Sequence, residues 1–184
     1  MGSFRLFFAV DVPEETRKEL GAATTEIGGI APHVRPVSRG SFHLTLLFLG
    51  DQPEEVLPSL EAIGAQAVAP ARSCQVALGP PGFFPRVSFL TLVGEIETLA
   101  MVSTVLSDSC RPYMEKPEDR PFKPHITIAR LKQNLRPPEK ARIVSVLEKF
   151  EGRAWTINEL VLYKSDLSPK GAAYTALARF PFGG

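Results

Sequence analysis

The chain has 184 residues, a length that suits one globular domain or two lobes sharing a core. Its formal net charge is only +1, which excludes the broad positive surface of a general nucleic-acid-binding protein. Cys74 and Cys110 have no C-x-x-C spacing and therefore indicate neither a zinc site nor a disulfide framework. We expect one domain over residues 1–184, acting as a monomer in a reducing cytoplasm without a membrane segment.

The first part of the chain predicts a strand, a helix and a loop. Residues Phe4–Val10 are apolar apart from Arg5, as in a strand covered on both faces, and too few for a signal peptide or a membrane span. Residues 11–15, Asp-Val-Pro-Glu-Glu, are typical of a helix start, and Gly28-Gly29 marks the end of that helix. Residues 32–40 predict a loop or short strand with His33 on the surface.

The middle of the chain predicts a strand, a second helix and a hairpin. The strand runs from His43 to Gly50, and residues 51–55 repeat the helix-start pattern before a second amphipathic stripe. Residues 74–93 have strand signals on both sides of a Gly-Pro-Pro-Gly turn at residues 79–82. Arg86 in this hairpin is either a cation of a binding groove or a solvated surface residue.

The last part of the chain again predicts both helices and strands. A helix is predicted over residues 97–113, a Pro- and charge-rich loop over 114–124, a strand from His125 and a helix from Pro137. Two strands close the chain, Trp155–Tyr163 and Ala172–Phe180, joined by a turn near residues 168–171. We therefore expect an α+β fold of two lobes, each a mainly antiparallel sheet backed by helices, related by a pseudo-two-fold around a central cleft.

Two of the strands share a pattern of histidine, apolar residue, threonine and apolar residue. They are His43-Leu44-Thr45-Leu46 and His125-Ile126-Thr127-Ile128. Because side chains alternate along a strand, each histidine shares a face with its threonine. The chain has only three histidines, so the odds that two of them meet threonine at this spacing by chance are about 1 %. If these strands face one another across the cleft, two imidazoles and two hydroxyls surround one phosphate, which indicates acid–base phosphoester chemistry without a metal.

At His43-x-Thr45-x-x-Phe48 and His125-x-Thr127-x-x-Arg130 the chain resembles the two-histidine (2H) phosphoesterases, and among them the LigT-like RNA 2′,3′-cyclic phosphodiesterases of the ThpR family. The flanks that agree are Arg5–Asp11, Leu46–Gly50, Phe83–Val87 and Glu159–Ser165. This resemblance implies hydrolysis of a 2′,3′-cyclic phosphate to a 2′-phosphate, on RNA 3′ ends or small cyclic nucleotides, with no metal and no cofactor. It also leaves open a reversible 2′–5′ RNA ligase activity.

The same resemblance implies a role for six residues. His43 is expected to be the proton donor to the leaving 3′ oxygen, and His125 the proton acceptor that activates water. The phosphate oxygens are expected to contact Thr45, Thr127 and Arg130, whose guanidinium suits bidentate binding. Phe48 is expected to stack on the terminal base.

Phe48 and Arg130 conflict with simple strand alternation. Each lies five positions after a histidine, an odd offset that a flat strand directs to the opposite face. Each strand must bulge, twist or end before them if they are to reach the groove. Otherwise Phe48 is a core residue and Arg130 a solvated cation at a strand end.

Two other functions compete with a two-histidine phosphodiesterase. The first is a non-catalytic module that binds RNA ends or nucleotides in the same groove, although binding alone does not call for two histidines in matched surroundings. The second is a metal-dependent phosphohydrolase, for which the carboxylate-rich ligand spacing is missing from the sequence.

Overall fold

The structure is a computed structural model that describes residues 2–114, 121–168 and 171–183. Its strands are β1 (Ser3–Asp11), β2 (Val34–Pro36), β3 (His43–Pro53), β4 (Cys74–Phe84), β5 (Val87–Gly94), β6 (His125–Leu131), β7 (Ala154–Ile157), β8 (Glu159–Ser168) and β9 (Gly171–Pro181). Its helices are α1 (Glu14–Gly28), α2 (Leu57–Val68), α3 (Ile96–Ser109) and α4 (Pro137–Leu147). Short 3-10 turns are η1 (Arg39–Ser41), η2 (Glu54–Val56), η3 (Arg111–Tyr113) and η4 (Glu148–Phe150).

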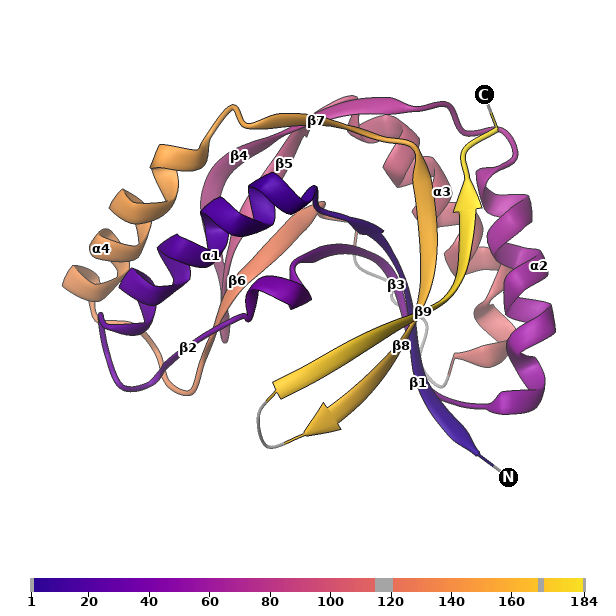
Figure 1. The fold of residues 1–184 in the computed structure, drawn as a ribbon, viewed down its shortest axis with the longest axis horizontal. Coiled ribbons are helices and arrows are strands. Elements are labelled where there is room, and N and C mark those ends of the chain that lie inside the picture. Colours follow the sequence, from indigo (N-terminus) through magenta and orange to yellow (C-terminus); the bar gives the residue numbers. More distant parts are fainter. Residues whose placement is uncertain (1, 115–120, 169–170, 184) are drawn as a thin grey trace.

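The described strands form one curled, antiparallel sheet backed by two pairs of helices (Figure 1). The strand order is β7-β4-β5-β6-β3-β1-β8-β9, with β2 added beside β6. Helices α1 and α4 pack together over the β2–β6 half, and α2 and α3 pack together beside β3, β8 and β9. The predicted α+β class, with antiparallel strands backed by helices, is confirmed. The pseudo-two-fold between the halves stays a prediction.

The two halves meet within the sheet instead of facing one another as separate sheets. Strands β3 and β6 are neighbours, paired antiparallel at a single position, Leu44 with Ile126. Both residues belong to a main core that extends through both halves, from Leu6 to Phe182. Because one connected core serves both halves, we propose that residues 1–184 form one domain. A smaller cluster of Phe7, Ala9, Val161 and Tyr163 covers part of the opposite face.

Strand β3 is longer than predicted. Residues 51–53 continue the strand past Gly50 because Ser3–Arg5 of β1 provide a partner for them. Gln52 is buried there, and its side-chain amide donates hydrogen bonds of 2.8 Å to the carbonyls of Leu49 and Tyr113. The helix start predicted at Asp51 is therefore wrong, and α2 begins only after η2.

The Gly-Pro-Pro-Gly segment is not a turn. Strand β4 runs through it to Phe84, with a bulge between Leu78 and Pro81. A bulge accommodates proline, which cannot donate to the sheet ladder. The glycines make room for side chains of β5: a Cβ on Gly79 would lie 2.7 Å from the Thr91 hydroxyl, and one on Gly82 would collide with the Phe89 ring. Glycine is needed here for close packing against β5. The sequence pattern predicted a turn instead, because glycine is also common in turns.

The predicted strand Trp155–Tyr163 is two strands. It breaks at Asn158, so that β7 pairs with β4 while β8 pairs with β1 and β9. A sequence pattern describes local conformation but not which neighbour a strand joins, so this crossing from one half of the sheet to the other was not predicted.

Two predicted segments are only partly described by the structure, and the predicted position of His33 is wrong. Residues 115–120 of the predicted loop and 169–170 of the predicted turn lie outside the described residues. His33 is not a surface residue as predicted: its side chain is only 11 % exposed, and its Nε2 lies 3.5 Å from a Glu139 carboxylate oxygen. Among the described residues, no helix combines the length and apolar character needed to cross a membrane.

Candidate active site

A β-bulge in each His-x-Thr strand resolves the odd spacing of Phe48 and Arg130. The pairing of β3 with β1 shifts by one residue after Thr45, and the pairing of β6 with β5 shifts by one residue after Thr127. Two consecutive buried residues mark each bulge, Leu46-Leu47 and Ile128-Ala129. The next residue is exposed in both strands, and Phe48 is 47 % exposed. Of the predicted ways to reconcile the spacing, both strands have the bulge, and Phe48 is not a core residue.

The two motifs lie side by side on one face of the sheet. Counted outward from the Leu44–Ile126 pair, His43 is next to Thr127 and Thr45 is next to His125. The two histidines are then diagonal neighbours, which in antiparallel pairs stand about 7–8 Å apart. Leu44 and Ile126 bury the other face, so both imidazoles project away from the main core. This spacing leaves room for a phosphate between the rings.

Backbone carbonyls orient both imidazoles in the same way. The Nδ1–H of His43 donates to the carbonyl of Ser41 at 2.8 Å, and the Nδ1–H of His125 donates to that of Lys123 at 2.7 Å. A carbonyl can only accept, so Nδ1 carries the proton in both rings. Nε2 is therefore the reactive nitrogen of each neutral histidine, and in His43 it accepts a 3.0 Å hydrogen bond from the Thr45 hydroxyl.

Aromatic rings support each imidazole. The His43 ring lies 4.9 Å from the ring of Phe7 and 5.1 Å, edge to face, from the ring of Tyr174. The His125 ring lies 5.2 Å from Phe84 and 5.1 Å from Phe89. The space that Gly82 leaves open admits the Phe89 ring, so the misread glycine contributes to the support of His125. These contacts restrict ring rotation and hold Nε2 in place.

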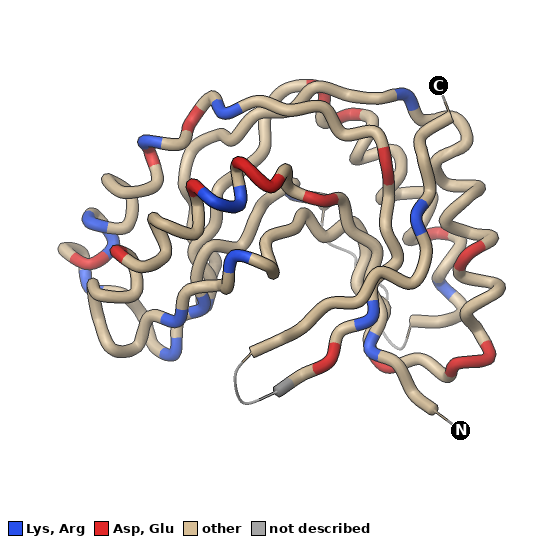
Figure 2. The backbone as a smooth tube through the Cα atoms, in the orientation of Figure 1, with Lys and Arg blue, Asp and Glu red and all other residues tan. Residues whose placement is uncertain are grey.

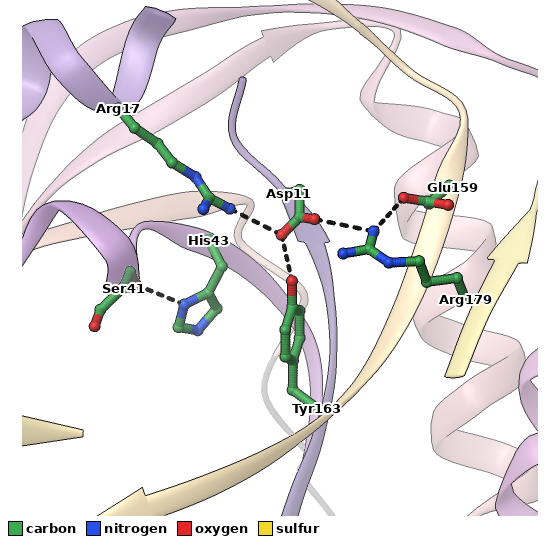
Figure 3. Close-up of polar contacts among 7 residues, drawn as sticks. All are labelled: Asp11, Arg17, Ser41, His43, Glu159, Tyr163 and Arg179. Carbon is green, nitrogen blue, oxygen red and sulfur yellow. Dashed lines mark hydrogen bonds and ion pairs between the residues drawn. The ribbon is translucent and has the colours of Figure 1, made fainter. Parts of the chain in front are cut away.

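Asp11 is the centre of a polar network beside His43, its partner across the β1–β3 pair (Figure 3). One carboxylate oxygen accepts hydrogen bonds from Arg17 at 2.9 Å and from the Tyr163 hydroxyl at 2.6 Å, and the other accepts one from Arg179 at 3.3 Å. The sequence predicts Asp11 as part of a helix start, but α1 begins only after Pro13. Strand alternation could have placed Asp11 on the face of the site, because Asp11 shares a face with Phe7 when β1 continues to residue 11.

An open pocket of about 240 Å³ lies against His43 and this network. Arg17, Gly40, Tyr163 and Tyr174 contribute to its wall. Burial and the hydrogen bond to Asp11 raise the pKa of Tyr163 to about 12, so this phenol stays protonated and neutral. Burial also raises the pKa of Tyr174. The two tyrosines therefore give the wall beside His43 polar groups without adding negative charge to that of Asp11.

The pKa of His43 is lowered below its ordinary value of 6.5. Burial is the main cause, because it disfavours the charged imidazolium. The Ser41 carbonyl and the Asp11 carboxylate oppose this effect, whereas the positive charges of Arg17 and Arg130 add to it. Arg130 follows the bulge in β6, which turns its exposed side chain to the face that carries the two histidines.

We expect the His43 imidazole to titrate below pH 6.5 in the isolated protein, and Asp11→Asn to move its midpoint further down. The substitution removes a negative charge that favours the imidazolium, while Arg17 remains and disfavours it. The measurement is an NMR titration of the His43 ring protons. Asp108→Asn, an exposed position on α3, is the matched control. A midpoint above 6.5, or one indifferent to Asp11→Asn, contradicts this account.

Phe48 and Arg130 flank the two motifs on the same face. The Arg5 guanidinium lies over the Phe48 ring, 4.7 Å from its centroid. Arg5 and Arg130 both act electrostatically on Tyr174, whose ring contacts His43. The structure thus brings the six residues singled out from the sequence to one surface, with Tyr174 and Arg5 as neighbours that the sequence did not reveal.

Comparison with known proteins agrees with this geometry. The family model of the 2′-5′ RNA ligase superfamily matches residues 12–169. This chain belongs to that superfamily. The matched range contains both His-x-Thr strands, so the two-histidine resemblance recognised from short motifs is confirmed at the level of the whole fold.

Relatives in the superfamily match this chain over nearly its whole length. An RNA 2′,3′-cyclic phosphodiesterase of Thermus thermophilus is 35 % identical over 98 % of this chain and 91 % of its own, and one of Archaeoglobus fulgidus is 30 % identical over 96 % and 99 %. Among crystal structures, TT0787 of Thermus thermophilus superposes with a TM-score of 0.80 at 32 % identity, covering 98 % of both chains. Escherichia coli LigT complexed with 3′-AMP superposes with a TM-score of 0.80 at 26 % identity, covering both chains completely.

The residues around the site do not form a metal-binding set. Within the described residues, no group of three or more histidine, cysteine, aspartate or glutamate side chains could hold a metal ion. The one carboxylate described beside His43, that of Asp11, is already engaged by two arginines and a tyrosine. The groups available for chemistry in the site are therefore two imidazoles, two hydroxyls and a guanidinium, from the two histidines, the two threonines and Arg130.

Proposed function

We propose that this protein hydrolyses RNA 2′,3′-cyclic phosphate ends to 2′-phosphates, with His43 as proton donor and His125 as proton acceptor. The observation that carries the proposal is the matched pair of imidazoles on adjacent strands, each with Nδ1 held by a backbone carbonyl and Nε2 left for chemistry. The names of the curated relatives support the substrate. The 3′-AMP complex of a structural relative supports a nucleotide-binding cleft in this fold.

The reaction requires two proton transfers at one phosphorus atom. His125 Nε2 takes a proton from water as the water oxygen forms a bond to phosphorus, and the bond from phosphorus to the 3′ oxygen breaks. His43 Nε2 delivers a proton to that 3′ oxygen, so a 3′ hydroxyl and a 2′-phosphate result. Each transfer is typically worth about 10²–10⁴ in rate. The products leave His43 neutral and His125 protonated, and proton exchange with solvent restores the starting state.

Three side chains are proposed to bind the phosphate. The hydroxyls of Thr45 and Thr127 donate to non-bridging oxygens, which for Thr45 means exchanging its contact with His43 Nε2 for one with the phosphate. Arg130 binds the same group through paired N–H donors as negative charge develops on it. The bound phosphate also raises the pKa of His43, because an adjacent anion favours the imidazolium. Binding of the substrate therefore favours the protonated form of His43, which is the form that donates the proton.

Phe48 is proposed to stack on the terminal base. Arg5 occupies one side of its ring, while the side chain remains 47 % exposed. Stacking on an aromatic ring is worth about 1–3 kcal/mol per base and tolerates any base. That tolerance suits an enzyme that acts on RNA 3′ ends of varied sequence, or on small cyclic nucleotides.

We further propose that the protein works as a monomer in the cytoplasm. Both cysteines are buried free thiols, and burial raises the pKa of Cys110 to about 11, which suppresses its reactive thiolate form. Neither thiol takes part in the proposed chemistry.

The decisive experiment is an end-group assay on an RNA that carries a 2′,3′-cyclic phosphate, performed in excess EDTA. We expect full conversion to the 2′-phosphate, because the two imidazoles supply both proton transfers without a metal. Formation of the 3′-phosphate, or activity that appears only after metal is added, contradicts the proposed mechanism. Tight binding of the RNA without turnover supports instead the non-catalytic end-binding module.

Membership of the 2′-5′ RNA ligase superfamily favours joining as a second activity. In that reaction the 5′ hydroxyl of a second RNA takes the place of water, and His125 removes its proton. Incubation of the cyclic phosphate RNA with excess 5′-hydroxyl RNA tests this, with a 2′–5′ linkage as the expected product. A 3′–5′ linkage contradicts attachment through the 2′ oxygen.

A further inference from the structure

Strand β3 contains two bulges, one on each side of Phe48. In its pairing with β1 the register skips Leu46 and, further along the strand, Leu49. The first bulge turns Phe48 to the face of the two histidines, and the second returns Gln52 to the core side of the sheet. The exposure of Phe48 therefore depends on a short segment that departs from the regular ladder at both ends.

A buried polar side chain binds the carbonyl of each skipped residue. The Leu46 carbonyl accepts a 2.8 Å hydrogen bond from the hydroxyl of Ser103, which lies in the middle of α3. The Leu49 carbonyl accepts one of 2.8 Å from the side-chain amide of Gln52, which also donates to the Tyr113 carbonyl. Ser103 is 7 % exposed and Gln52 is 6 % exposed. We call Ser103 and Gln52 the bulge clamp.

The Leu46 carbonyl needs a partner from outside the sheet. A bulge leaves its extra residue out of the ladder, and a buried carbonyl without a hydrogen bond destabilises the conformation that contains it. Within the described residues β3 pairs with β6 only at Leu44, so β6 does not take up the Leu46 carbonyl. Loss of the Ser103 hydroxyl therefore disfavours the bulged conformation and favours a shift of the segment that carries Phe48.

The bulge in β6 is held in a different way. Its extra residue is Ile128, whose carbonyl accepts a 2.8 Å hydrogen bond from the backbone amide of Val37, just after β2. The bulge that presents Arg130 therefore depends on a bond between two backbone groups. The bulge that presents Phe48 depends on a side chain of α3, so a single substitution can alter Phe48 without altering Arg130.

The Phe48 ring is placed relative to β1 as well. Arg5 of β1 lies over the ring, and its Nη1 is 4.0 Å from a carboxylate oxygen of Asp51, its partner across the β1–β3 pair. Figure 2 shows positive and negative residues close together at this end of the sheet, near the N-terminus. A shift of β3 at its bulges moves Phe48 relative to the Arg5 guanidinium and changes the orientation of the ring.

We propose that Ser103 and Gln52 are positioning residues for base binding, because they hold the two bulges of β3 and keep the Phe48 ring in the orientation that stacks on the terminal base. The inference rests on the proposed function and adds two buried residues from outside the site. A base contact that is equally strong in the bound substrate and the transition state affects binding alone. Loss of the clamp should therefore raise KM and leave kcat unchanged.

Steady-state kinetics on adenosine 2′,3′-cyclic phosphate test the clamp. Phe48→Ala is expected to raise KM about 5–150-fold, the range for loss of one stacked base, and Ser103→Ala about fivefold. In the Phe48→Ala protein, Ser103→Ala should raise KM no further, because the ring that Ser103 positions is gone. Thr104→Ala is the matched control, since the Thr104 hydroxyl donates to the Ala100 carbonyl within α3.

A loss of stability alone is controlled by a substitution in the other half of the molecule. Ile143 is buried in the main core on α4, which packs against α1 and β4. Ile143→Val removes one buried methyl group there and is expected to lower the melting temperature without changing KM.

A fluorine NMR measurement tests the position of the ring without turnover. 4-Fluorophenylalanine is introduced at residue 48 alone, and its resonance is recorded in the free protein. We expect the resonance to shift in Ser103→Ala and in Gln52→Met, which keeps a side chain of similar length but removes the amide. In Thr104→Ala it should stay in place.

A resonance that is unchanged in one clamp variant removes that residue from the clamp, and one unchanged in both overturns the proposal. A resonance that shifts while KM stays constant excludes the clamp from base binding. An increase in KM that Ser103→Ala produces equally in the Phe48→Ala protein also overturns the proposal. A protein that hydrolyses no cyclic phosphate contradicts the proposed function alone, and the fluorine resonance then still decides whether the clamp positions Phe48.

Discussion

Replacement of His43 or His125 by alanine is expected to lower kcat about 10²–10⁴-fold, the usual contribution of one positioned proton-transfer group. The double replacement should reduce kcat little further than the worse single one, because groups that act in one step are not additive. Initial rates on a cyclic phosphate substrate measure both effects. The control is His33→Ala, since His33 contacts Glu139 and Gln133 and lies outside the site. Retained turnover in either site variant excludes that histidine from acid–base chemistry.

The pH dependence of these variants separates the two roles. The unaltered protein should show a bell-shaped profile, because the donor must be protonated and the acceptor neutral. Residual activity of His43→Ala should lose the decline toward high pH, since the donor that deprotonates there is gone. Residual activity of His125→Ala should lose the decline toward low pH. The opposite pattern reverses the assignment of donor and acceptor while keeping the histidine pair.

Replacement of Arg130 by alanine is expected to lower kcat about 10²–10³-fold, as does removal of a single donor that stabilises developing charge on an oxygen. Arg130→Lys should recover part of the activity, because it restores the charge but not the paired N–H donors. This decrease should be the same for mononucleotide and oligonucleotide substrates, because both present the reacting phosphate to Arg130. Exposed Arg142 on α4 supplies the control substitution, Arg142→Ala.

A titration verifies the position of Arg130 without reference to turnover. Its positive charge lowers the pKa of His43, so the midpoint of the His43 titration should rise in Arg130→Ala. A decrease in kcat without that rise means that Arg130 acts elsewhere than beside the imidazole. A rise without a decrease in kcat removes Arg130 from phosphate binding.

Prediction from the sequence succeeded where the information is local. Alternation within each His-x-Thr strand places histidine and threonine on one face, and it holds in the structure because both strands bury their leucine and isoleucine residues in the main core. The conflict at Phe48 and Arg130 was equally informative, because a bulge was the way to reconcile it and both strands have one. Prediction failed at Gly79–Gly82, where glycine meets side chains of another strand, and at Asp11, whose partners come from α1, β8 and β9.

By itself, the sequence determined the α+β class, the two matched motifs and the kinds of groups that meet at the site, because periodicity and residue chemistry are local properties of a chain. Only the tertiary structure decided that β3 and β6 are neighbours in one sheet, that Asp11 and Tyr174 flank His43, and that Arg35 opposes Arg130. Pairing between strands far apart in the sequence depends on which apolar faces pack together across the whole core, and no short pattern encodes that choice.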